Sequence, residues 1–352
     1  MSGRKRIAVL PGDGIGTEVI LQAVNAVRAT GAAVEFTEFD WGADRYLRDG
    51  VTVPPDGLSM LARDFDAILV GAFGDPRVPS NVHAKDILLG MRFQLDLYAN
   101  VRPVKLLDPA LCPLKQANPE RVNFTIIREN TEGLYCDVGG VFKRGTPDEV
   151  AVQEDVNTRK GVERIIRYAF DYARRHRRKH VLMTDKSNVM TYAHGLWQRV
   201  FKDVGADYPE IEKQHMFVDA LAMQMVRDPG QFDVIVTNNM FGDIISDLGA
   251  ALQGGLGMAA SGNIHPGRTS MFEPVHGSAP AIAGKNLANP IGAIVTASMM
   301  LAHLGLAREA EIIDAAILDA VRQQKITEDV GGHLGTRECG KWIATRIADL
   351  RS

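Results

Sequence analysis

Two aspartates that lie four residues apart are the first feature of this sequence that could do chemistry. Asp243 and Asp247 come just after a predicted strand. In a helix this spacing places both carboxylates on one face, which is the arrangement that a hard divalent cation such as Mg²⁺ or Mn²⁺ requires. Asp219 could supply a third oxygen ligand. From the spacing alone, a helix cap at Asp243 and a solvated Asp247 are the simpler interpretation.

Three arginines stand beside apolar or strand-end positions and could bind carboxylates. They are Arg92, Arg102 and Arg128. A planar guanidinium binds a carboxylate through two parallel hydrogen bonds, so the set favours a dicarboxylate substrate. Each arginine taken singly is better explained by a surface or domain-bridging salt bridge. Tyr135 and Lys186 also follow predicted strands, where a lone tyrosine or lysine is usually structural.

Two loops have the composition of nucleotide-binding segments. Residues 10–16 read Leu-Pro-Gly-Asp-Gly-Ile-Gly between a predicted strand and a predicted helix. Their G-x-G-x-G spacing differs from the dinucleotide fingerprint, so a tight structural turn explains them at least as well. Residues 273–290 form a long polar loop that we expect between helical stretches. Exposed amides of such a loop could hold an adenosine and a pyrophosphate.

The segments that would position these residues alternate between strand-like and helix-like patterns. A helix is predicted at 17–30, and buried strands are predicted at 6–10, 34–39, 67–71, 124–128, 180–183 and 232–236. This alternation predicts a largely parallel sheet covered by helices, with ligands at the carboxyl ends of its strands. Residues 139–155 differ, because their alternation after glycine and proline predicts an exposed hairpin of the kind that pairs with another chain.

Length and composition limit the classes of function. The chain has 352 residues, 45% hydrophobic and 24% charged, with a net charge of -3, and it has no linker-like segment. These values predict a globular protein of one large domain or two intimately joined domains. The basic run at 174–179 suits a helix end better than a nucleic-acid patch. Three scattered cysteines predict a reducing compartment, and the apolar runs at 7–10 and 293–307 are too short for a signal peptide or a membrane span. We therefore expect a cytoplasmic protein without nucleic-acid or membrane partners.

Taken together, the motifs resemble the isocitrate/isopropylmalate dehydrogenase family of β-decarboxylating dehydrogenases, nearest to 3-isopropylmalate and D-malate/tartrate dehydrogenases. The matching segments are residues 10–16, 96–103, 128–135, 184–188 and 329–332, together with the aspartate and loop segments above. The resemblance implies an α/β, two-domain fold with a mixed, largely parallel sheet, and not a classical Rossmann fold.

The resemblance also implies how the chain is divided and assembled. Residues 1–97 plus 254–352 would form the large cofactor-binding domain, and residues 98–253 the dimerisation and substrate domain. The hairpin at 139–155 would be an arm clasped between two subunits of a homodimer. Lys186 and Asp219 would reach across into the active site of the partner.

The activity implied is the oxidative decarboxylation of a (2R)-malate-type 2-hydroxy acid. Arg92, Arg102 and Arg128 would bind its carboxylates. Asp243 and Asp247 would hold Mg²⁺ or Mn²⁺ together with Asp219 of the partner subunit. Asp219 would also contact the substrate.

Two further side chains and a loop complete the implied machinery. Lys186 would be the general base that takes the hydroxyl proton, and Tyr135 would protonate the enolate left when CO₂ departs. The resemblance assigns NAD to a set in the polar loop, namely Glu273, His276, Gly277, Ser278, Ala279, Ile282 and Asn289.

Two departures from the family pattern bear on the cofactor. Ala281 stands where relatives place an acidic residue on the adenosine ribose, which weakens the case for NAD. The lysine–tyrosine pair of NADP-using isocitrate enzymes is also missing, and Glu328 stands where those enzymes carry a phosphate-binding tyrosine. A carboxylate there would repel a 2′-phosphate, so NAD is the better prediction.

The variable pocket bears on the substrate. Leu88 and Leu89 suit an alkyl group or a small C4 acid, which fits both 3-isopropylmalate and D-malate or tartrate. Lys85 replaces the glutamate typical of isopropylmalate enzymes, and residues 139–164 look more like D-malate/tartrate enzymes. 3-Isopropylmalate is slightly favoured because it is the commoner substrate in the family, and D-malate or tartrate is the alternative.

Two other classes of function compete with an enzyme. A regulatory subunit of a hetero-oligomeric NAD-isocitrate dehydrogenase would have lost catalytic side chains, whereas this chain keeps Tyr135, Lys186, Asp243 and Asp247. A nucleotide-binding module without redox chemistry would leave the arginines and aspartates unexplained.

Overall fold

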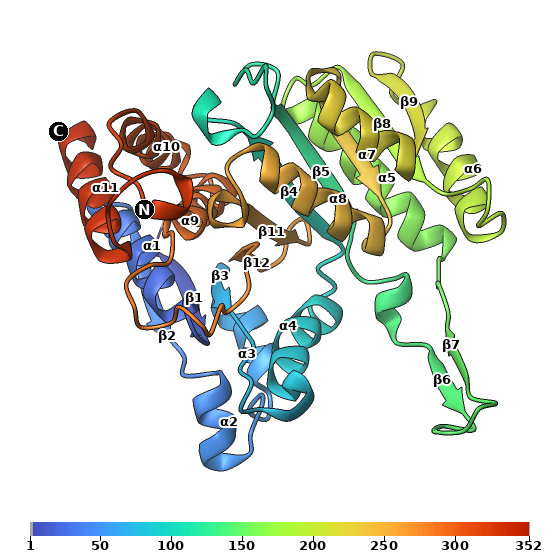
Figure 1. Ribbon diagram of the computed structural model, residues 1–352, viewed down its shortest axis with the longest axis horizontal. Coiled ribbons are helices and arrows are strands. Elements are labelled where there is room, and N and C mark those ends of the chain that lie inside the picture. Colours follow the sequence, from blue (N-terminus) through green and yellow to red (C-terminus); the bar gives the residue numbers. More distant parts are fainter. Residues whose placement is uncertain (1–2, 352) are drawn as a thin grey trace.

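A ten-stranded sheet runs through the computed structural model, which describes residues 3–351 (Figure 1). Its strand order is β2-β1-β3-β12-β11-β4-β5-β10-β8-β9. The strands of this sheet are β1 Lys5–Gly12, β2 Val34–Glu38, β3 Ala67–Ala72, β4 Ala99–Lys105, β5 Asn123–Glu129, β8 His180–Asp185, β9 Glu212–Phe217, β10 Val234–Thr237, β11 Ala260–Ile264 and β12 Ser270–Pro274. Every predicted strand is present, with ends that shift by one or two residues.

Eleven α-helices accompany the strands in residues 3–351. They are α1 Gly16–Thr30, α2 Ala43–Asp49, α3 Gly57–Asp64, α4 Val82–Gln94, α5 Arg159–Arg175, α6 Ala193–Gly205, α7 Val218–Arg227, α8 Asn239–Leu252, α9 Ile291–His303, α10 Ala307–Arg322 and α11 Thr336–Arg351. None of them is long and apolar enough to cross a membrane.

The sheet is antiparallel only at its centre. The pairs β12–β11, β11–β4 and β4–β5 are antiparallel, and the other pairs are parallel. This mixed, largely parallel sheet confirms the predicted α/β class. The polar loop expected between helices instead follows strand β12 and leads into α9. The loop therefore begins at a strand end in the middle of the sheet.

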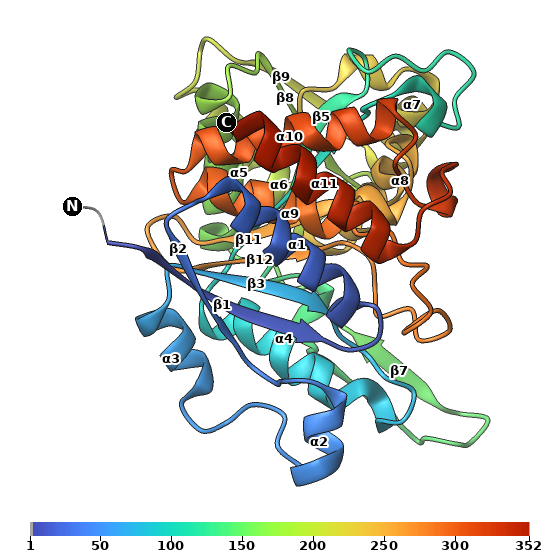
Figure 2. The same cartoon turned by 90° about the vertical axis from the view of Figure 1, so that its left-hand side faces the viewer.

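Alternating side chains give the two faces of the sheet different cores. In β1, Ile7 and Val9 point to one face, where a single apolar core continues under α1, α9, α10 and α11 and on to α5 and α6. Ala8 and Leu10 point to the other face, where one core lies under α3 and α4 and a separate core lies under α7 and α8. Figure 2 shows α1 and α11 on one side of β1 and β3, with α3 and α4 on the opposite side. We call these the undivided face and the divided face.

The predicted hairpin is confirmed and stands apart from the rest of the fold. Strands β6 (Gly139–Phe142) and β7 (Val150–Gln153) pair with each other, and all their residues are exposed. The ribbon projects well beyond the body of the protein (Figure 1). Apolar side chains are therefore open to solvent in this chain, among them Phe142, which is 67% exposed.

The predicted domain boundaries lie between elements of secondary structure. The first, after residue 97, lies between α4 and β4, and the second, after residue 253, lies between α8 and β11. Because β4 pairs with β11, the sheet is continuous across this border. The division into two domains stays a prediction.

Candidate active site

The central strands bury a row of polar side chains on the divided face. In β4, Ala99 and Val101 join the undivided core, so Asn100 and Arg102 point to the opposite side. The same alternation in β5, β11 and β12 adds further polar side chains between the two cores of the divided face. We call this row the polar seam; its members, all buried, are Asn100, Arg102, Arg128, Ser261, Asn263 and Glu273.

Arg92 reaches the seam from α4. Its Nη2 donates to Glu273 Oε1 at 2.9 Å, while its Nε is buried and has no hydrogen-bond partner within residues 3–351. Arg92, Arg102 and Glu273 line a cavity of about 160 Å³ together with Leu88 and His276. Unsatisfied polar atoms beside a cavity are the groups that a polar ligand would satisfy.

Arg102 and Arg128 meet the predicted metal ligands at the other end of the seam. Arg128 Nη1 donates a short hydrogen bond to Asp243 Oδ1, and Tyr135 Oη donates to Asp243 Oδ2 at 2.9 Å. Arg102 Nη1 lies 3.4 Å from Asp243 and 4.0 Å from Asp247. Five of the predicted site residues, drawn from two stretches of the sequence (102–135 and 243–247), therefore form one cluster.

The cluster sets the protonation of its members. Burial raises the pKa of Asp243, but Arg128 and Arg102 lower it more, so the net pKa lies below the usual value and the group is a carboxylate. Burial raises the pKa of Asp247, against the weaker influence of Arg102. Burial also raises the pKa of Tyr135, which keeps its hydroxyl protonated at neutral pH.

Helix α8 places the aspartates as their spacing predicts. Its N-cap is Asn238, whose Oδ1 accepts from the Phe241 amide at 2.9 Å, so the alternative in which Asp243 caps the helix is wrong. Gly242 packs so closely on Arg128 that a Cβ at this position would overlap that side chain. Sequence reasoning missed this glycine, although its place directly before Asp243 was a usable signal.

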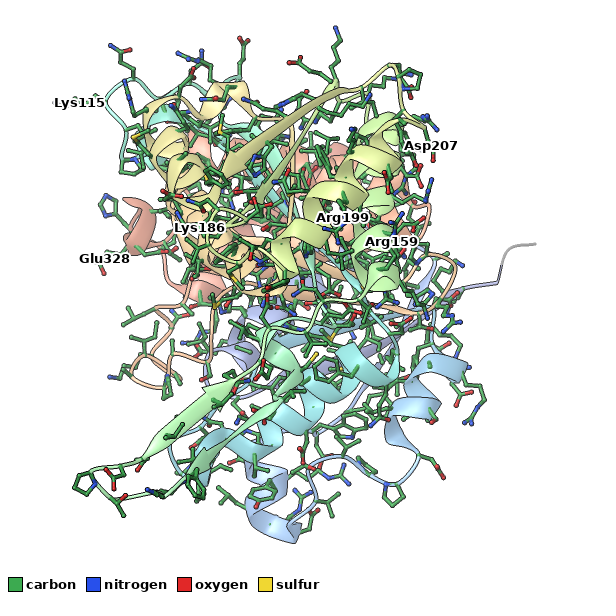
Figure 3. The ribbon with its side chains drawn as sticks, turned by 90° about the vertical axis from the view of Figure 1, so that its right-hand side faces the viewer. Lys115, Arg159, Lys186, Arg199, Asp207 and Glu328 are labelled. Carbon is green, nitrogen blue, oxygen red and sulfur yellow. The ribbon has the colours of Figure 1, made fainter. Side chains whose placement is uncertain are left out.

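Lys186 and Asp219 do not join the cluster in this chain. Lys186 Nζ donates to Asp219 Oδ1 at 2.7 Å, and neither side chain forms a hydrogen bond or ion pair with the arginines or with Asp243 in the part of the chain that the structure describes. Figure 3 labels Lys186 on the side of the molecule where β8 and α6 lie. No group of three or more His, Cys, Asp and Glu side chains that could hold a metal ion occurs within residues 3–351. Of the three predicted metal ligands, Asp243 and Asp247 therefore lie together in one chain, and Asp219 lies apart from them.

The β1–α1 turn supports the predicted cofactor loop. The Ile15 amide donates to Ser278 O at 2.9 Å, and Gly14, with φ 55°, packs so closely on Ser278 O that a Cβ there would overlap it. Asp13, which lies in the same turn, is buried, and its carboxylate accepts from His83 Nε2 at 2.7 Å. The turn is therefore a structural platform for the loop, and sequence reasoning missed its anchor in His83.

The predicted cofactor residues differ in their exposure and in whether their polar groups are already hydrogen-bonded within the fold. His276 Nε2 is buried without a hydrogen-bond partner among the described residues, and burial lowers the pKa of His276, so the ring is neutral. Gly277 lines the same cavity and is exposed; Ala279 is exposed and Ile282 is half-buried. Asn289 is instead engaged in the fold, because its amide donates to Asp329 Oδ2 at 3.1 Å and accepts from the Ile291 amide.

The two departures from the family pattern lie beside this loop. Ala281 is exposed in the loop itself. Glu328 is exposed on the adjacent turn Glu328–Val330, which the Asn289–Asp329 hydrogen bond ties to the loop (Figure 3). The turn that carries Glu328 is therefore hydrogen-bonded to the predicted cofactor loop.

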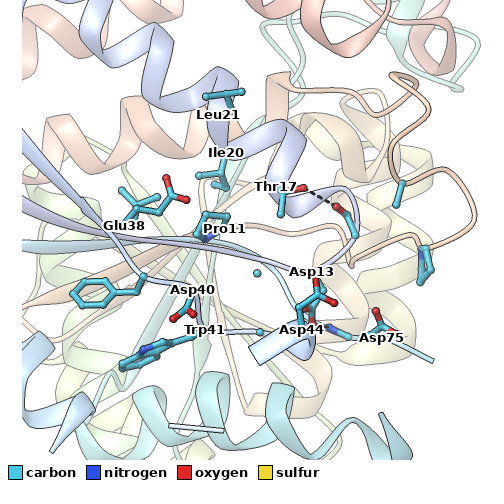
Figure 4. Close-up of a pocket in the computed structure, with 18 of the residues that line it drawn as sticks. Pro11, Asp13, Thr17, Ile20, Leu21, Glu38, Asp40, Trp41, Asp44 and Asp75 are labelled. Atoms are coloured by element: carbon cyan, nitrogen blue, oxygen red, sulfur yellow. Dashed lines mark hydrogen bonds between the residues drawn. The ribbon is translucent and has the colours of Figure 1, made fainter. Parts of the chain in front are cut away.

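A larger cavity of about 760 Å³ lies on the far side of the β1–α1 turn (Figure 4). Pro11, Gly12, Asp13 and Gly14 of the glycine-rich turn line it, but none of the residues predicted to bind substrate, metal or NAD does. Three of its acidic groups are neutralised by arginines, since Asp40 pairs with Arg48 and both Asp44 and Asp75 pair with Arg77. This cavity is not part of the arginine–aspartate cluster.

Comparison with known proteins gives consistent matches over the whole chain. The family model described as isocitrate/isopropylmalate dehydrogenase matches residues 6–343. A 3-isopropylmalate dehydrogenase of Nocardia farcinica is 50% identical over 97% of this chain and all of its own length, and one of Thermobifida fusca is 46% identical over 99% of both. The crystal structure of isocitrate dehydrogenase from Methylococcus capsulatus is 37% identical, with a TM-score of 0.89 over 98% of this chain and 99% of that one.

Proposed function

This chain belongs to the isocitrate/isopropylmalate dehydrogenase family, and from that premise we propose that it catalyses the NAD- and metal-dependent oxidative decarboxylation of a malate-type 2-hydroxy acid. The family predicted from the sequence is confirmed. The observation that carries the proposed reaction is the convergence of Arg102, Arg128 and Tyr135 on Asp243, with Arg92 beside Arg102 at the small cavity. Three guanidiniums beside a protonated phenol and an ionised carboxylate suit a dicarboxylate that must lose CO₂.

The arginines would bind the two carboxylates of the substrate. Arg92 has a free Nε at the cavity of about 160 Å³, and Arg102 lines the same cavity. Arg128 is held from behind by Asn239, whose Oδ1 accepts from Nε at 3.1 Å and from Nη2 at 2.7 Å. These fixed guanidiniums are pre-oriented for bidentate contacts with a carboxylate. Arginine makes such contacts and lysine does not.

Asp243 and Asp247 would hold Mg²⁺ or Mn²⁺, with Asp219 of the partner subunit as a third ligand. Two carboxylates on one helix face are hard oxygen donors of the kind that these ions prefer. When bound, the ion supplies positive charge at the hydroxyl and carboxylate oxygens, and NAD accepts the hydride. Lys186 of the partner subunit would accept the hydroxyl proton at Nζ, and Tyr135 would donate the proton of its Oη to the enolate carbon after CO₂ leaves.

A shared active site requires a homodimer, and the exposed apolar surface supports one. The hairpin β6–β7 exposes Phe142 and Val150, and α7 and α8 expose Met223, Val226 and Ile244, each at least 47% accessible in the single chain. Exposed apolar patches on this scale mark interaction surfaces. A pair of chains that covers them would bring Lys186 and Asp219 of each subunit to the cluster of the other.

NAD would lie on the loop that follows β12. His276, whose buried Nε2 has no hydrogen-bond partner in residues 3–351, lines the same cavity as Arg92, so the loop would meet the substrate site there. The exposed carboxylate of Glu328 favours NAD over NADP because it would repel a 2′-phosphate.

We propose 3-isopropylmalate as the first substrate, because the relatives described above carry that name. One observation favours tartrate as the second candidate. Lys85 lines a cavity with Leu89 and Tyr135, and its ammonium forms no hydrogen bond or ion pair in residues 3–351. A free cation there suits a polar substituent better than an alkyl group.

The test is Mn²⁺-dependent reduction of NAD and of NADP by purified protein, with 3-isopropylmalate, D-malate, tartrate and isocitrate in parallel. Turnover of one acid with NAD is expected. If no acid is turned over by a protein that forms dimers and binds Mn²⁺, the proposed reaction is contradicted and the regulatory-subunit alternative is favoured.

Mixed dimers test the shared site separately. A Lys186→Met chain and a Tyr135→Phe chain should each be inactive alone. Mixed and reassociated, they should recover about a quarter of the wild-type activity, because half of the dimers are mixed and each carries one intact site. No recovery in verified mixed dimers would contradict the shared site.

A further inference from the structure

We propose that Asn263 is a positioning residue, which sets the spacing of Arg92, Arg102 and Glu273 through an unbroken chain of buried hydrogen bonds. This inference rests on the proposed function, which assigns the two arginines to the substrate and Glu273 to the cofactor loop. Asn263 is fully buried and does not line the cavity between those side chains. It would therefore act through its neighbours and not by touching a ligand.

The chain of hydrogen bonds joins the two ends of the site. On one side, Arg102 Nε donates to Asn100 Oδ1 at 2.8 Å, and Asn100 Nδ2 donates to Asn263 Oδ1 at 2.9 Å. On the other side, Asn263 Nδ2 donates to Glu273 Oε1 at 2.9 Å, and the same oxygen accepts from Arg92 Nη2 at 2.9 Å. The four bonds thus connect a guanidinium of β4 to a guanidinium of α4.

Neighbouring strands make this connection short. Asn100 lies on β4, Asn263 on β11 and Glu273 on β12, and these three strands are adjacent in the centre of the sheet (Figure 1). Asn263 and Asn100 are direct partners in the β11–β4 register. Side chains directly opposite each other on one face of an antiparallel pair lie within contact distance, which is why two amides span the border between the two cores of the divided face.

The direction of every bond is fixed by its surroundings. Asn263 Oδ1 accepts a second hydrogen bond, from Asn130 Nδ2 at 2.9 Å, while Asn100 Nδ2 also donates to Ser261 Oγ at 2.7 Å. A flipped amide at Asn263 would place its NH₂ against two other NH₂ groups and its oxygen against the carboxylate of Glu273. Every polar side-chain atom of Asn100 and Asn263 thus has a hydrogen-bond partner, which is the condition for a buried amide to hold one orientation. The orientation of the Asn263 amide is therefore coupled to the positions of both Arg92 and Arg102.

This arrangement predicts which side chains can replace Asn263. A buried side chain at position 263 must accept a hydrogen bond from β4 and donate one to Glu273 on β12. Leucine has a similar volume but can do neither, and aspartate keeps the acceptor but loses the donor. Leucine would thus release Asn100, Asn130 and Glu273 together, whereas aspartate would place a second carboxylate against Glu273.

The experiment compares Asn263→Leu and Asn263→Asp with the matched control Thr125→Val. Thr125 is a buried side chain of β5, whose hydroxyl contacts Tyr172 Oη on the undivided face, far along the strand from the site. The readouts are kcat, the KM of the hydroxy acid, the KM of NAD, and the melting temperature of each dimer. Both Asn263 variants should raise the KM of the acid and of NAD at least tenfold. Thr125→Val should lower the melting temperature and leave both KM values within twofold.

Two outcomes separate this inference from the proposed function. If the wild type is active and Asn263→Leu keeps both KM values within threefold, the positioning role is overturned and the proposed reaction stands. If the wild type turns over no acid, the proposed reaction fails, and the role of Asn263 is judged by NADH binding measured by fluorescence. A dissociation constant raised at least fivefold in Asn263→Leu but not in Thr125→Val supports the role, and an unchanged constant overturns it.

Discussion

The two faces of the central sheet are formed by the same strands but are packed differently. On the undivided face, one apolar core runs from α11 at one end of the molecule to α6 at the other. On the divided face, the cores under α3 and α4 and under α7 and α8 stop short of each other, and the polar seam lies between them. The undivided face therefore holds the two halves together, and the divided face provides a place where charge can be buried.

Buried charge is tolerated in the polar seam because none of its six residues has a buried side-chain polar atom without a hydrogen-bond partner. The buried atoms without a partner in residues 3–351 belong to other side chains and include Arg92 Nε, Asn130 Oδ1 and His276 Nε2. Two of these three belong to residues that line the cavity of about 160 Å³. An unpaired buried donor is costly to a fold unless something else satisfies it, so these atoms are where a ligand gains most. The difference between the faces leads to predictions in which stability and activity change separately.

The largest effect is expected from Arg128→Lys on the divided face. A lysine keeps the charge, but it cannot donate to Asp243 and Asn239 at the same time. Breaking a buried, hydrogen-bonded charge pair costs about 2–5 kcal/mol, which corresponds to a loss of roughly 30- to 5,000-fold in kcat/KM. Steady-state kinetics measure it. Arg121→Lys, in an exposed pair with Asp228, is the matched control and should change kcat/KM less than twofold; a loss below tenfold for Arg128→Lys would contradict the assignment.

A core deletion on the undivided face should have the opposite signature. Ile294 is fully buried in α9. Ile294→Ala should lower the free energy of unfolding by about 2–5 kcal/mol through lost burial and a residual cavity. Urea denaturation measures this change, and the KM values of the folded enzyme should stay within twofold. A tenfold rise in either KM would mean that the two faces are not independent.

Gly242→Ala tests the contact between α8 and the seam. The added methyl group would overlap the side chain of Arg128 and push its guanidinium away from Asp243. Overpacking of this kind costs about 1–3 kcal/mol, and if it falls on the site it lowers kcat/KM roughly 10- to 100-fold. Kinetics and melting temperature are measured together. A loss of stability without a change in kcat/KM would show that Arg128 can shift without consequence.

The smallest effect is expected at alkaline pH on the undivided face. Burial raises the pKa of Tyr168 to about 12, above its ordinary value of 10.0. A group whose pKa is raised on folding stabilises the fold below its unfolded pKa, and this contribution is lost as the pH rises from 10 toward 12. The free energy of unfolding should therefore fall by about 1 kcal/mol more between pH 9 and pH 11 in the wild type than in Tyr168→Phe. Equal slopes in the two proteins would contradict the shift.

Local pattern was sufficient for most of the fold and for part of the site. The strand segments and the spacing of Asp243 and Asp247 are periodic features, so they could be predicted from the sequence. The hairpin β6–β7 followed from alternation in the same way. The N-cap of α8 could not be predicted in this way. Asn238 caps the helix because its backbone is extended, and no spacing rule distinguishes Asn238 from Asp243 as the capping residue.

Asn263 and His83 were missed in the sequence analysis for a different reason. Asn263 meets Asn100 across 163 positions, and His83 meets Asp13 across 70. Such pairs depend on which distant segments become neighbours. Asn263 meets Asn100 through the antiparallel pairing of β11 with β4, and His83 of α4 meets Asp13 in the turn after β1. A weaker signal did exist, since Asn100 and Arg102 alternate with apolar residues in a buried strand.

The most direct test of the central claim is the ratio of CO₂ released to NADH formed, measured on one sample with the acid that is turned over. The account predicts one CO₂ for each NADH in the presence of Mn²⁺, and loss of both products when EDTA is added or when Asp243 is replaced by asparagine. NADH formed without CO₂, or a rate that EDTA leaves unchanged, would contradict a metal-dependent oxidative decarboxylation at this site.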